Sequence, residues 1–468
     1  MERLIKIGQV QPKSSKEIKF SKVGIGFEKL DRDVFDPEKA YDKVAEIGVK
    51  KARIQSGWAK CEKEKGIYDF AWLDSIVDNL YDRGIEPWIC LCYGNPVYTE
   101  AAKQVFGAVG CPPIFTEEEK QAWINYTKAV VERYKGKVNY YEVWNEPDGQ
   151  WCWKHGQNSK ELGEFTIATA KAVKDVNPEA KTIGGVICYH TLDFLNGALK
   201  TGMGEYLDFI SFHEYTADET NVFEKVESFL ALAKSYNPKL ELIQGESGSQ
   251  SRSGGHGALK CGGWTEWKQA KQLARHTIAD LLCDVHFTSY FSCLDMIEGL
   301  NGVVDNKASY LDYGYFGVLG ADFDEDGKAT GEYYRKPSFY ALQNICSIFS
   351  EDCKTCVIPT FVYPEYEERI YDIQPSRRQL ITGGFEKKNG KAFTYWYPSN
   401  IMTVDFESSI SIEFYSESTD IKLVDVMDGS IYRIPEEMII DEGDGAYRIN
   451  GLPVKDTPLL LVMGDFLE

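Results

Sequence analysis

The chain has few histidines and no long apolar run. Its six histidines never form the His-x-His pair with which metal-dependent barrel hydrolases hold a metal ion. No segment approaches the ~20 consecutive apolar residues of a membrane-spanning helix. The first twenty residues also lack the apolar block, about 7 to 15 residues long, of a secretory signal. We therefore expect no metal, no membrane partner and a cytoplasmic location.

Positive charge is also scarce. Lys and Arg number 52 against 72 Asp and Glu, which gives a formal net charge of −20. Such a balance repels the phosphate backbone of nucleic acids, so we predict no nucleic-acid partner and a neutral substrate instead. Association into a homo-oligomer remains open.

Two features resemble metal sites only superficially. Cys353 and Cys356 form a lone C-x-x-C pair among twelve scattered cysteines, without the second pair that a zinc site requires. The run from Asp322 to Gly327 resembles the start of an EF-hand calcium loop, but its twelfth position is Tyr333 instead of glutamate. We interpret the first as ordinary reduced thiols and the second as a solvated acidic turn.

The order of predicted elements indicates an α/β fold. Helical spacing occurs over residues 71–81, and Thr116-Glu117-Glu118-Glu119 resembles a capping box that opens a helix to about Tyr134. Such stretches alternate with apolar, β-branched runs, and eight alternations predict a (β/α)8 TIM barrel over residues 21–350. The runs cover residues 23–27, 51–55, 85–92, 139–145, 181–188, 207–213, 240–246 and 286–292.

The pattern changes after a predicted helix over residues 336–349. Short alternating stretches with turn signals follow, which predict a β-sandwich domain over residues 355–468. Residues 1–20 also alternate apolar and polar side chains. We expect them to add a strand to that sandwich or to cover the floor of the barrel.

Two glutamates stand at predicted strand ends. Glu146 follows the fourth run and Glu246 closes the seventh, 100 residues later, which fits three β/α units of about 31 residues each. Both carboxylates then lie on the C-terminal face, where barrel enzymes carry their chemistry. A carboxylic acid paired with a carboxylate is what glycoside hydrolysis requires. Alternatives for the second carboxylate are Glu241, Asp295 and Glu298, whereas Glu142 is predicted to be a paired interior group and Glu214 to face away.

Specific motifs resemble clan A of the retaining glycoside hydrolases. Trp144-Asn145-Glu146-Pro147, Phe212-His213-Glu214-Tyr215 and Glu246 carry this resemblance. Within the clan the chain is most similar to glycoside hydrolase family 39, the family of β-xylosidases and α-L-iduronidases. The runs 70–78 and 83–88 and the segment Tyr93-Gly94-Asn95-Pro96 also resemble that family, so the resemblance spans roughly residues 20 to 345.

The resemblance implies a role for each matched residue. Glu146 would be the general acid/base and Glu246 the nucleophile of a double displacement, with no cofactor. Tyr215 would donate a hydrogen bond to Glu246, Arg53 would be its electrostatic partner, and Asn145 would bind the sugar 2-hydroxyl. The other residues expected to contact a carbohydrate substrate are Asn95, His213, Trp151, Trp153 and Trp264.

Several alternatives stay open. Packing in the core is the competing interpretation for each tryptophan, and the eighth run has no Trp at its end, although many clan A enzymes do. A β-linked substrate trimmed from its end, as in a β-xylosidase, is the expectation. An endo-acting β-glycanase, a transglycosidase and a non-catalytic carbohydrate-binding protein are the alternatives. The sequence does not distinguish which sugar is recognised.

Overall fold

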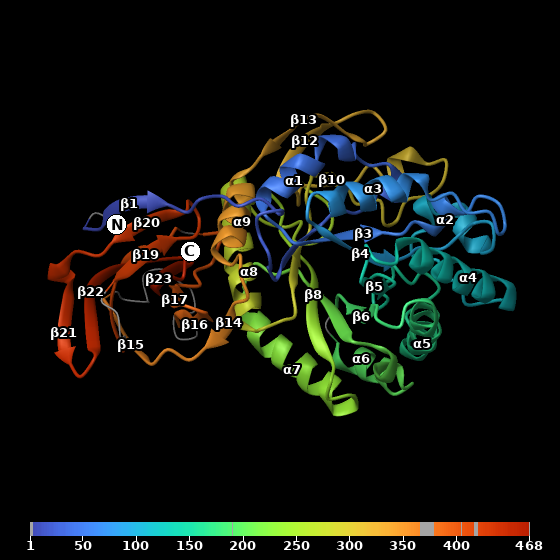
Figure 1. Ribbon diagram of the computed structural model, residues 1–468. Coiled ribbons are helices and arrows are strands. Elements are labelled where there is room, and N and C mark those ends of the chain that lie inside the picture. The colour runs from blue at the N-terminus through green and yellow to red at the C-terminus, as the bar shows by residue number, and fades with distance from the viewer. Residues whose placement is uncertain (1–2, 190, 366–378, 404, 416–419, 468) are drawn as a thin grey trace.

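The computed structural model describes residues 3–189, 191–365, 379–403, 405–415 and 420–467 (Figure 1). Eight parallel strands close into a barrel because the first strand pairs with both the second and the last. This confirms the predicted (β/α)8 barrel. The strands are β2 (Val23–Gly26), β3 (Lys51–Gln55), β4 (Glu86–Leu91), β5 (Tyr140–Val143), β6 (Lys181–Ile187), β7 (Phe209–Glu214), β8 (Glu241–Ser247) and β9 (Thr288–Tyr290).

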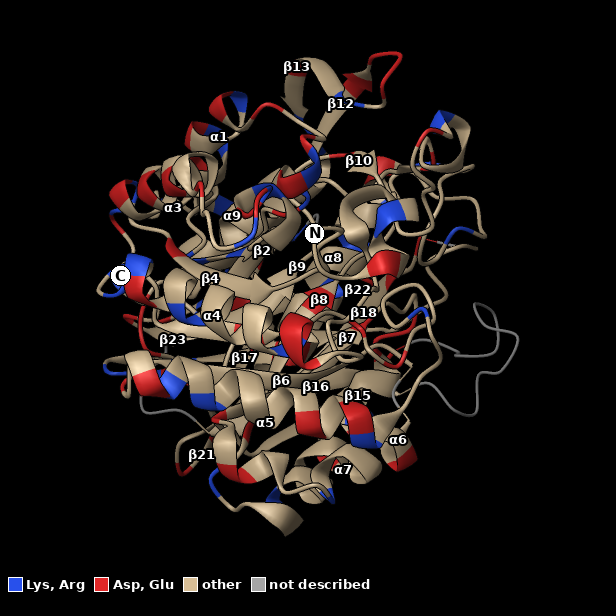
Figure 2. Ribbon diagram, turned by 90° about the vertical axis from the view of Figure 1, so that its right-hand side faces the viewer, with Lys and Arg blue, Asp and Glu red and all other residues tan. Residues whose placement is uncertain are grey.

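Helices surround the barrel. The predicted capping box is present at the start of α4, where Thr116 and Glu119 each accept a hydrogen bond from the other's backbone N–H. The helices are α1 (Tyr41–Ile47), α2 (Trp58–Cys61), α3 (Ala71–Asp82), α4 (Glu117–Tyr134), α5 (Ser159–Val176), α6 (Leu192–Leu199), α7 (Thr220–Tyr236), α8 (Glu266–Leu282) and α9 (Pro337–Ile348). Acidic and basic residues alternate along α4, α5 and α7, whereas the charged residues of α3 are all acidic (Figure 2). Within the described residues, no helix has the length and apolar character needed to cross a bilayer.

Two short hairpins separate β9 from α9. They are β10 (Met296–Ile297) with β11 (Tyr313–Gly314), and β12 (Leu319–Phe323) with β13 (Ala329–Arg335). The acidic run that resembles a calcium loop forms the turn of the second hairpin. There, the side chain of Asp324 accepts hydrogen bonds from the backbone N–H groups of Asp326 and Lys328.

A β-domain follows the barrel and packs beside α8 and α9 (Figure 1). A seven-stranded sheet, in the order β1-β20-β19-β23-β17-β16-β14, faces a four-stranded sheet, in the order β15-β18-β22-β21, across a shared apolar core. The strands are β1 (Ile5–Gln9), β14 (Lys354–Cys356), β15 (Thr360–Pro364), β16 (Ile381–Lys387), β17 (Gly390–Trp396), β18 (Glu407–Tyr415), β19 (Ile421–Asp425), β20 (Ser430–Arg433), β21 (Ile439–Gly443), β22 (Ala446–Lys455) and β23 (Leu459–Gly464).

The N-terminal segment contacts both the β-domain and the barrel. β1 pairs with β20 and so extends the larger sheet of the β-domain. The chain then reaches the N-terminal end of the barrel, where the Ser15 hydroxyl donates to the Val49 carbonyl at 2.7 Å and the Lys50 ammonium donates to the Ser15 carbonyl at 2.7 Å. The N-terminal residues therefore connect the two domains.

The interior of the barrel changes character along its axis. An apolar cluster of buried side chains fills its lower part: Trp88, Ile183, Phe209, Ile243 and Phe287. The guanidinium of Arg53 lies above this cluster, 5.4 Å from the centre of the Trp88 ring. Between Arg53 and the C-terminal face, the strands carry acidic and hydrogen-bonding side chains. The apolar layer therefore separates the site at that face from the floor of the barrel.

Candidate active site

Glu146 lies three residues beyond the end of β5, in a tightly turned segment. Trp144 and Glu146 have positive φ angles of 68° and 42°, a left-handed conformation that side-chain-bearing residues rarely adopt. The turn continues where the Gly149 N–H donates to the Glu146 carbonyl at 2.9 Å. Such backbone strain is concentrated at functional sites, where the surroundings hold it in place. Here it directs the Glu146 side chain over the mouth of the barrel.

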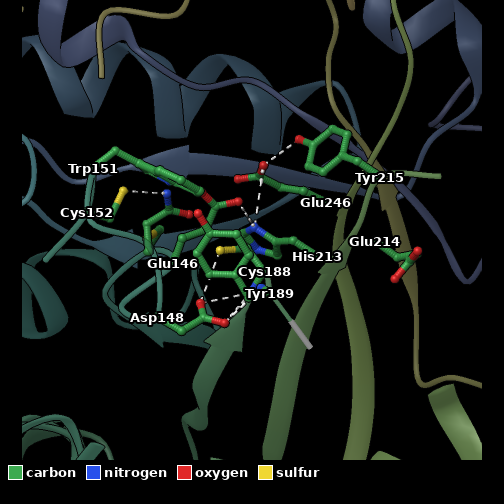
Figure 3. Close-up of polar contacts among 12 residues, drawn as sticks. Glu146, Asp148, Trp151, Cys152, Cys188, Tyr189, His213, Glu214, Tyr215 and Glu246 are labelled. Carbon is green, nitrogen blue, oxygen red and sulfur yellow. Dashed lines mark hydrogen bonds and ion pairs between the residues drawn. The ribbon is translucent and has the colours of Figure 1, made fainter. Parts of the chain in front are cut away.

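Both carboxylate oxygens of Glu146 have nitrogen neighbours (Figure 3). The indole N–H of Trp151 donates to Oε2 at 2.5 Å. His213, at the end of β7, places its Nδ1 atom 3.0 Å from Oε1. The carboxylate is therefore held from two sides, by Trp151 of the loop after β5 and by His213 of strand β7.

Glu246 lies within β8 and meets three polar partners. Tyr215 donates its hydroxyl hydrogen to Oε2 at 2.6 Å, Arg53 contacts Oε1 through Nη1, and Nδ1 of His213 lies 3.5 Å from Oε2. Burial alone would raise the pKa of Glu246. The positive charges of His213 and Arg53, together with the hydrogen bond from Tyr215, outweigh burial and hold that pKa below its ordinary value. Glu246 therefore stays ionised.

Arg53 organises the floor of the site. It is fully buried, and its Nη1 also lies 3.0 Å from Glu28 while its Nε donates to Glu142 at 2.9 Å. The predicted interior pairing of Glu142 is thus present. Nη2 of Arg53 donates to Oδ1 of the Asn145 side chain at 2.8 Å, and Nδ2 of the same side chain donates in turn to the Tyr93 hydroxyl at 3.0 Å. Asn145 lines the cavity in a fixed orientation.

A cavity of about 680 Å³ opens above these groups. The predicted site did not include Glu28 and Lys29, which line this cavity, and it included Glu298, a third lining residue, only as an alternative to Glu246. Lys29 donates to the Ile297 carbonyl at 3.0 Å and lies 3.5 Å from the Glu298 carboxylate. Burial raises the pKa of Glu28 and of Glu298 to about 7, against the opposing charges of Arg53 and Lys29 respectively. Glu28 directly follows the first apolar run, so its position at a predicted strand end could have placed it at the site.

The alternatives to Glu246 occupy other places. Glu241 begins β8 at the opposite end of the barrel, with its carboxylate 2.9 Å from Nδ1 of His286. Asp295 forms a buried ion pair with Lys336 at 2.7 Å. Glu214 points away from the carboxylate pair, as predicted, and forms an ion pair with Lys225 at 2.7 Å (Figure 3). Glu298 lines the cavity but lies on a different wall, in the loop after β10.

Four residues expected to contact the sugar lie outside the cavity lining: Asn95, His213, Trp153 and Trp264. His213 is fully buried, with its Nδ1 against Glu146. Trp153 is fully buried, packed edge-on against Trp144 with 5.9 Å between ring centres. Trp264 is 3% exposed and donates its indole N–H to the Leu259 carbonyl. The Asn95 amide donates to the Glu62 carbonyl at 2.8 Å, and its side-chain oxygen accepts from the backbone of its own loop. The expectation that these four side chains contact substrate is therefore corrected: His213 contacts Glu146, and the other three stabilise loops and core. Trp151, by contrast, does line the cavity.

Glu146, His213 and Glu246 each offer one ligand atom, and these atoms lie within 4.8 Å of one another. Such a set could in principle hold a metal ion. Its donors, however, already have partners in Trp151, Tyr215 and Arg53. The observed contacts suit acid–base and nucleophilic chemistry, in which one carboxylate is kept ionised and the other is held at the edge of the cavity.

Comparison with known proteins agrees with this arrangement. Residues 40–240 match the model of the glycosyl hydrolases of family 39. A β-xylosidase of Geobacillus stearothermophilus is 29% identical over 162 residues, which cover 33% of this chain and 32% of that protein. A β-xylosidase of Caldicellulosiruptor saccharolyticus is 30% identical over 182 residues, 36% of each chain. The similarity thus covers about a third of the length of these relatives.

Solved structures share the fold over a longer stretch. A family 39 glycoside hydrolase of Bacteroides cellulosilyticus aligns with a TM-score of 0.62 at 17% identity, over 94% of this chain and 80% of that chain. A monomeric β-xylosidase of Caulobacter crescentus aligns with a TM-score of 0.59 at 16% identity, over 98% of both chains. Over residues 40–240 the chain is therefore similar in sequence to the glycosyl hydrolases of family 39, and over nearly its whole length it shares the fold of these solved structures.

Proposed function

We propose that the protein is a retaining glycosidase that removes a β-linked sugar, such as xylose, from the end of a short glycoside. The separation of Glu146 and Glu246 carries this proposal, because one oxygen of each lies within 4.8 Å of the other. Retaining enzymes place their carboxyl groups about 5 to 5.5 Å apart, whereas inverting enzymes need about 6.5 to 9.5 Å to admit a water molecule. The short separation of this pair supports the retaining geometry.

The two carboxylates take complementary roles in a double displacement. Glu246, kept ionised by Arg53 and Tyr215, attacks the anomeric carbon as Glu146 gives its proton to the departing oxygen. Glu146 then removes a proton from water, which attacks the anomeric carbon and releases Glu246. Each step is assisted by a group already in place, since Trp151 and His213 hold Glu146 at the cavity edge.

The choice of substrate rests on the sequence relatives and on the cavity. The sequence relatives quoted above are β-xylosidases, and a bounded cavity of about 680 Å³ suits a short glycoside better than a long polymer. The twelve free cysteines support a reducing location such as the cytoplasm.

The first experiment is an activity screen on nitrophenyl α- and β-glycosides and on xylobiose. Wild type is compared with Glu146→Gln and Glu246→Gln, and the anomeric form of the first product is followed by NMR. We expect hydrolysis of a β-glycoside with retention and its loss in Glu246→Gln. Initial release of the opposite anomer would contradict the retaining mechanism.

A second experiment identifies the nucleophile. Glu246→Ala should be inactive in buffer, and azide should restore turnover with formation of a glycosyl azide of inverted configuration. The matched control is Glu298→Ala, another carboxylate of the same cavity. Azide rescue of that variant instead of Glu246→Ala would show that the nucleophile has been assigned to the wrong residue.

A further inference from the structure

Trp151 makes a contact that a sugar-stacking platform does not require. Its indole N–H points at Oε2 of Glu146 from 2.5 Å, while His213 occupies the other oxygen, Oε1, at 3.0 Å (Figure 3). An indole N–H can donate a hydrogen bond but cannot accept one. Oε2 of Glu146 therefore accepts this hydrogen bond, whichever way the proton lies between His213 and Oε1.

We propose that Trp151 is a positioning residue for the general acid: by donating to Oε2 of Glu146, it fixes the carboxyl group in the orientation from which the proton passes to the departing oxygen. This inference rests on the proposed glycosidase function. It gives Trp151 a role in the protonation of the leaving group, beyond any contact that its ring makes with sugar.

The loop after Glu146 is shaped to bring the indole back over the acid. A Cβ atom added to Gly149 would lie 2.6 Å from Cε2 and 3.0 Å from Nε1 of the Trp151 indole. Real Cβ contacts are essentially never that short, so the indole occupies space that only glycine leaves open. The φ angle of Gly149 is not in the positive range, and an alanine there would disturb the indole without straining the backbone.

Further contacts hold the indole from outside the turn. The Tyr189 ring packs against it at 5.3 Å between ring centres, inclined by 62°. Tyr189 is itself anchored, because its backbone N–H donates to the Asp148 carboxylate at 2.8 Å. Lys154 donates to the Trp151 carbonyl and to the Leu300 carbonyl, both at 2.8 Å. Trp151 is thus fixed both through its backbone carbonyl and through its ring before any substrate is bound.

Positioning and platform roles predict different kinetics. A stacking platform binds sugar, so its loss raises KM for all substrates that reach it. A residue that orients the acid assists the first step only when the departing oxygen needs a proton, so its loss lowers kcat/KM on poor leaving groups and spares kcat/KM on activated ones.

The test uses Trp151→Phe, which keeps an aromatic ring and removes the N–H. We expect kcat/KM for xylobiose or an alkyl xyloside to fall by about 10- to 100-fold, the effect of losing a hydrogen bond to a charged group. For a dinitrophenyl glycoside, whose leaving group needs no proton, we expect less than about a 2-fold change. Gly149→Ala retains the tryptophan but displaces it, and should show the same selective loss.

Trp153→Phe is the matched control, because it makes the same substitution in the same loop at a buried ring outside the cavity lining. It should leave the ratio of the two rates unchanged. An unchanged ratio in Trp151→Phe, or a uniform rise in KM, would overturn the positioning role. If Glu146→Gln itself showed no preference for activated leaving groups, the proposed function would fail, which is a different result from failure of this inference.

Discussion

Tyr215 donates its hydroxyl hydrogen to Oε2 of Glu246 at 2.6 Å. The Tyr215 ring is held by edge contacts with Phe291 and Phe316, with ring centres 6.4 Å and 5.8 Å away. Burial and the negative charge of Glu246 raise the pKa of Tyr215 well above its ordinary value. The hydroxyl therefore remains a donor over the whole working pH range, and the proposed nucleophile is always held in the same orientation.

Replacing Tyr215 by Phe removes this donor and keeps the ring contacts. We expect kcat/KM to fall by about 10- to 100-fold, because a hydrogen bond to a charged group contributes about 1.5 to 3 kcal/mol. The melting temperature should change little. Tyr189→Phe, a change of the same kind on the cavity wall, is the control and should retain most activity. Equal losses in the two variants would show that the hydroxyl of Tyr215 has no special relation to Glu246.

Arg53 is predicted to stabilise the fold as well as the site. Its guanidinium is fully buried and contacts the carboxylates of Glu28, Glu142 and Glu246. Arg53→Met would leave these acids buried without their cation, which costs about 3 to 5 kcal/mol when one partner of a buried pair is removed. Urea unfolding measures this loss. Lys422→Gln, which removes a more exposed pair with Asp420, should cost less than about 1 kcal/mol. A similar small loss for Arg53→Met would contradict the buried network.

The barrel and its two glutamates could be predicted because topology alone places strand ends together. Once eight apolar runs alternate with helices, residues that follow the fourth and seventh runs must meet at one face, whatever their loops do in detail. The positions of Glu146 and Glu246 could therefore be predicted from the order of the strands and helices alone. The same reasoning applied to Glu28 would have placed it at the site, since it follows the first run directly.

Loop residues could not be placed in this way. Trp151 and Trp153 stand two positions apart after Glu146, yet one lines the cavity and the other is fully buried. Their difference depends on the turn at Gly149, whose hydrogen bonds are set by the fold around it. Asn95 likewise satisfies its amide on its own loop and on Glu62, a contact with no local sequence signal. Composition indicates a polar, aromatic loop but not which side chain faces the substrate.

Glu298 should make stability depend on pH. Burial raises its pKa from 4.5 to about 7, and the negative charges of Asp312 and Glu246 add to the rise although Lys29 opposes it. The folded state therefore binds this proton more tightly than the unfolded state. The stability that this bound proton contributes is fully present below about pH 4.5 and is lost as the pH rises through about 7.

The matched variant is Glu298→Gln, which cannot ionise. Relative to wild type, its free energy of unfolding should improve as the pH is raised from about 4.5 to about 8, because only wild type loses a bound proton there. Thermal melts at several pH values measure the difference. Glu437→Gln, a change at an exposed glutamate of the β-domain, should run parallel to wild type at every pH. A Glu298→Gln curve that also runs parallel would show that Glu298 ionises normally.

The β-domain is predicted to support the barrel through polar contacts with α7 and α8. Trp396 of the β-domain donates its indole N–H to Glu219 at 2.7 Å, and Arg275 of α8 contacts both that carboxylate and the Ser399 carbonyl. Lys271, also on α8, forms a buried ion pair with Asp456 at 2.7 Å. These groups are buried only because the two domains cover each other.

Trp396→Ala should therefore lower stability by about 3 to 5 kcal/mol, since it removes a fully buried ring and a donor to a buried carboxylate. The change lies far from the cavity lining, so kcat of the folded variant should stay near that of wild type. Removing residues 355–468 extends the same argument, because it uncovers the charged side chains of Glu219, Lys271 and Arg275 together with one whole side of α8. We expect a barrel that aggregates or unfolds at much lower temperature. A truncated chain as stable and as active as the whole protein would show that the contacts across this interface contribute nothing to the barrel.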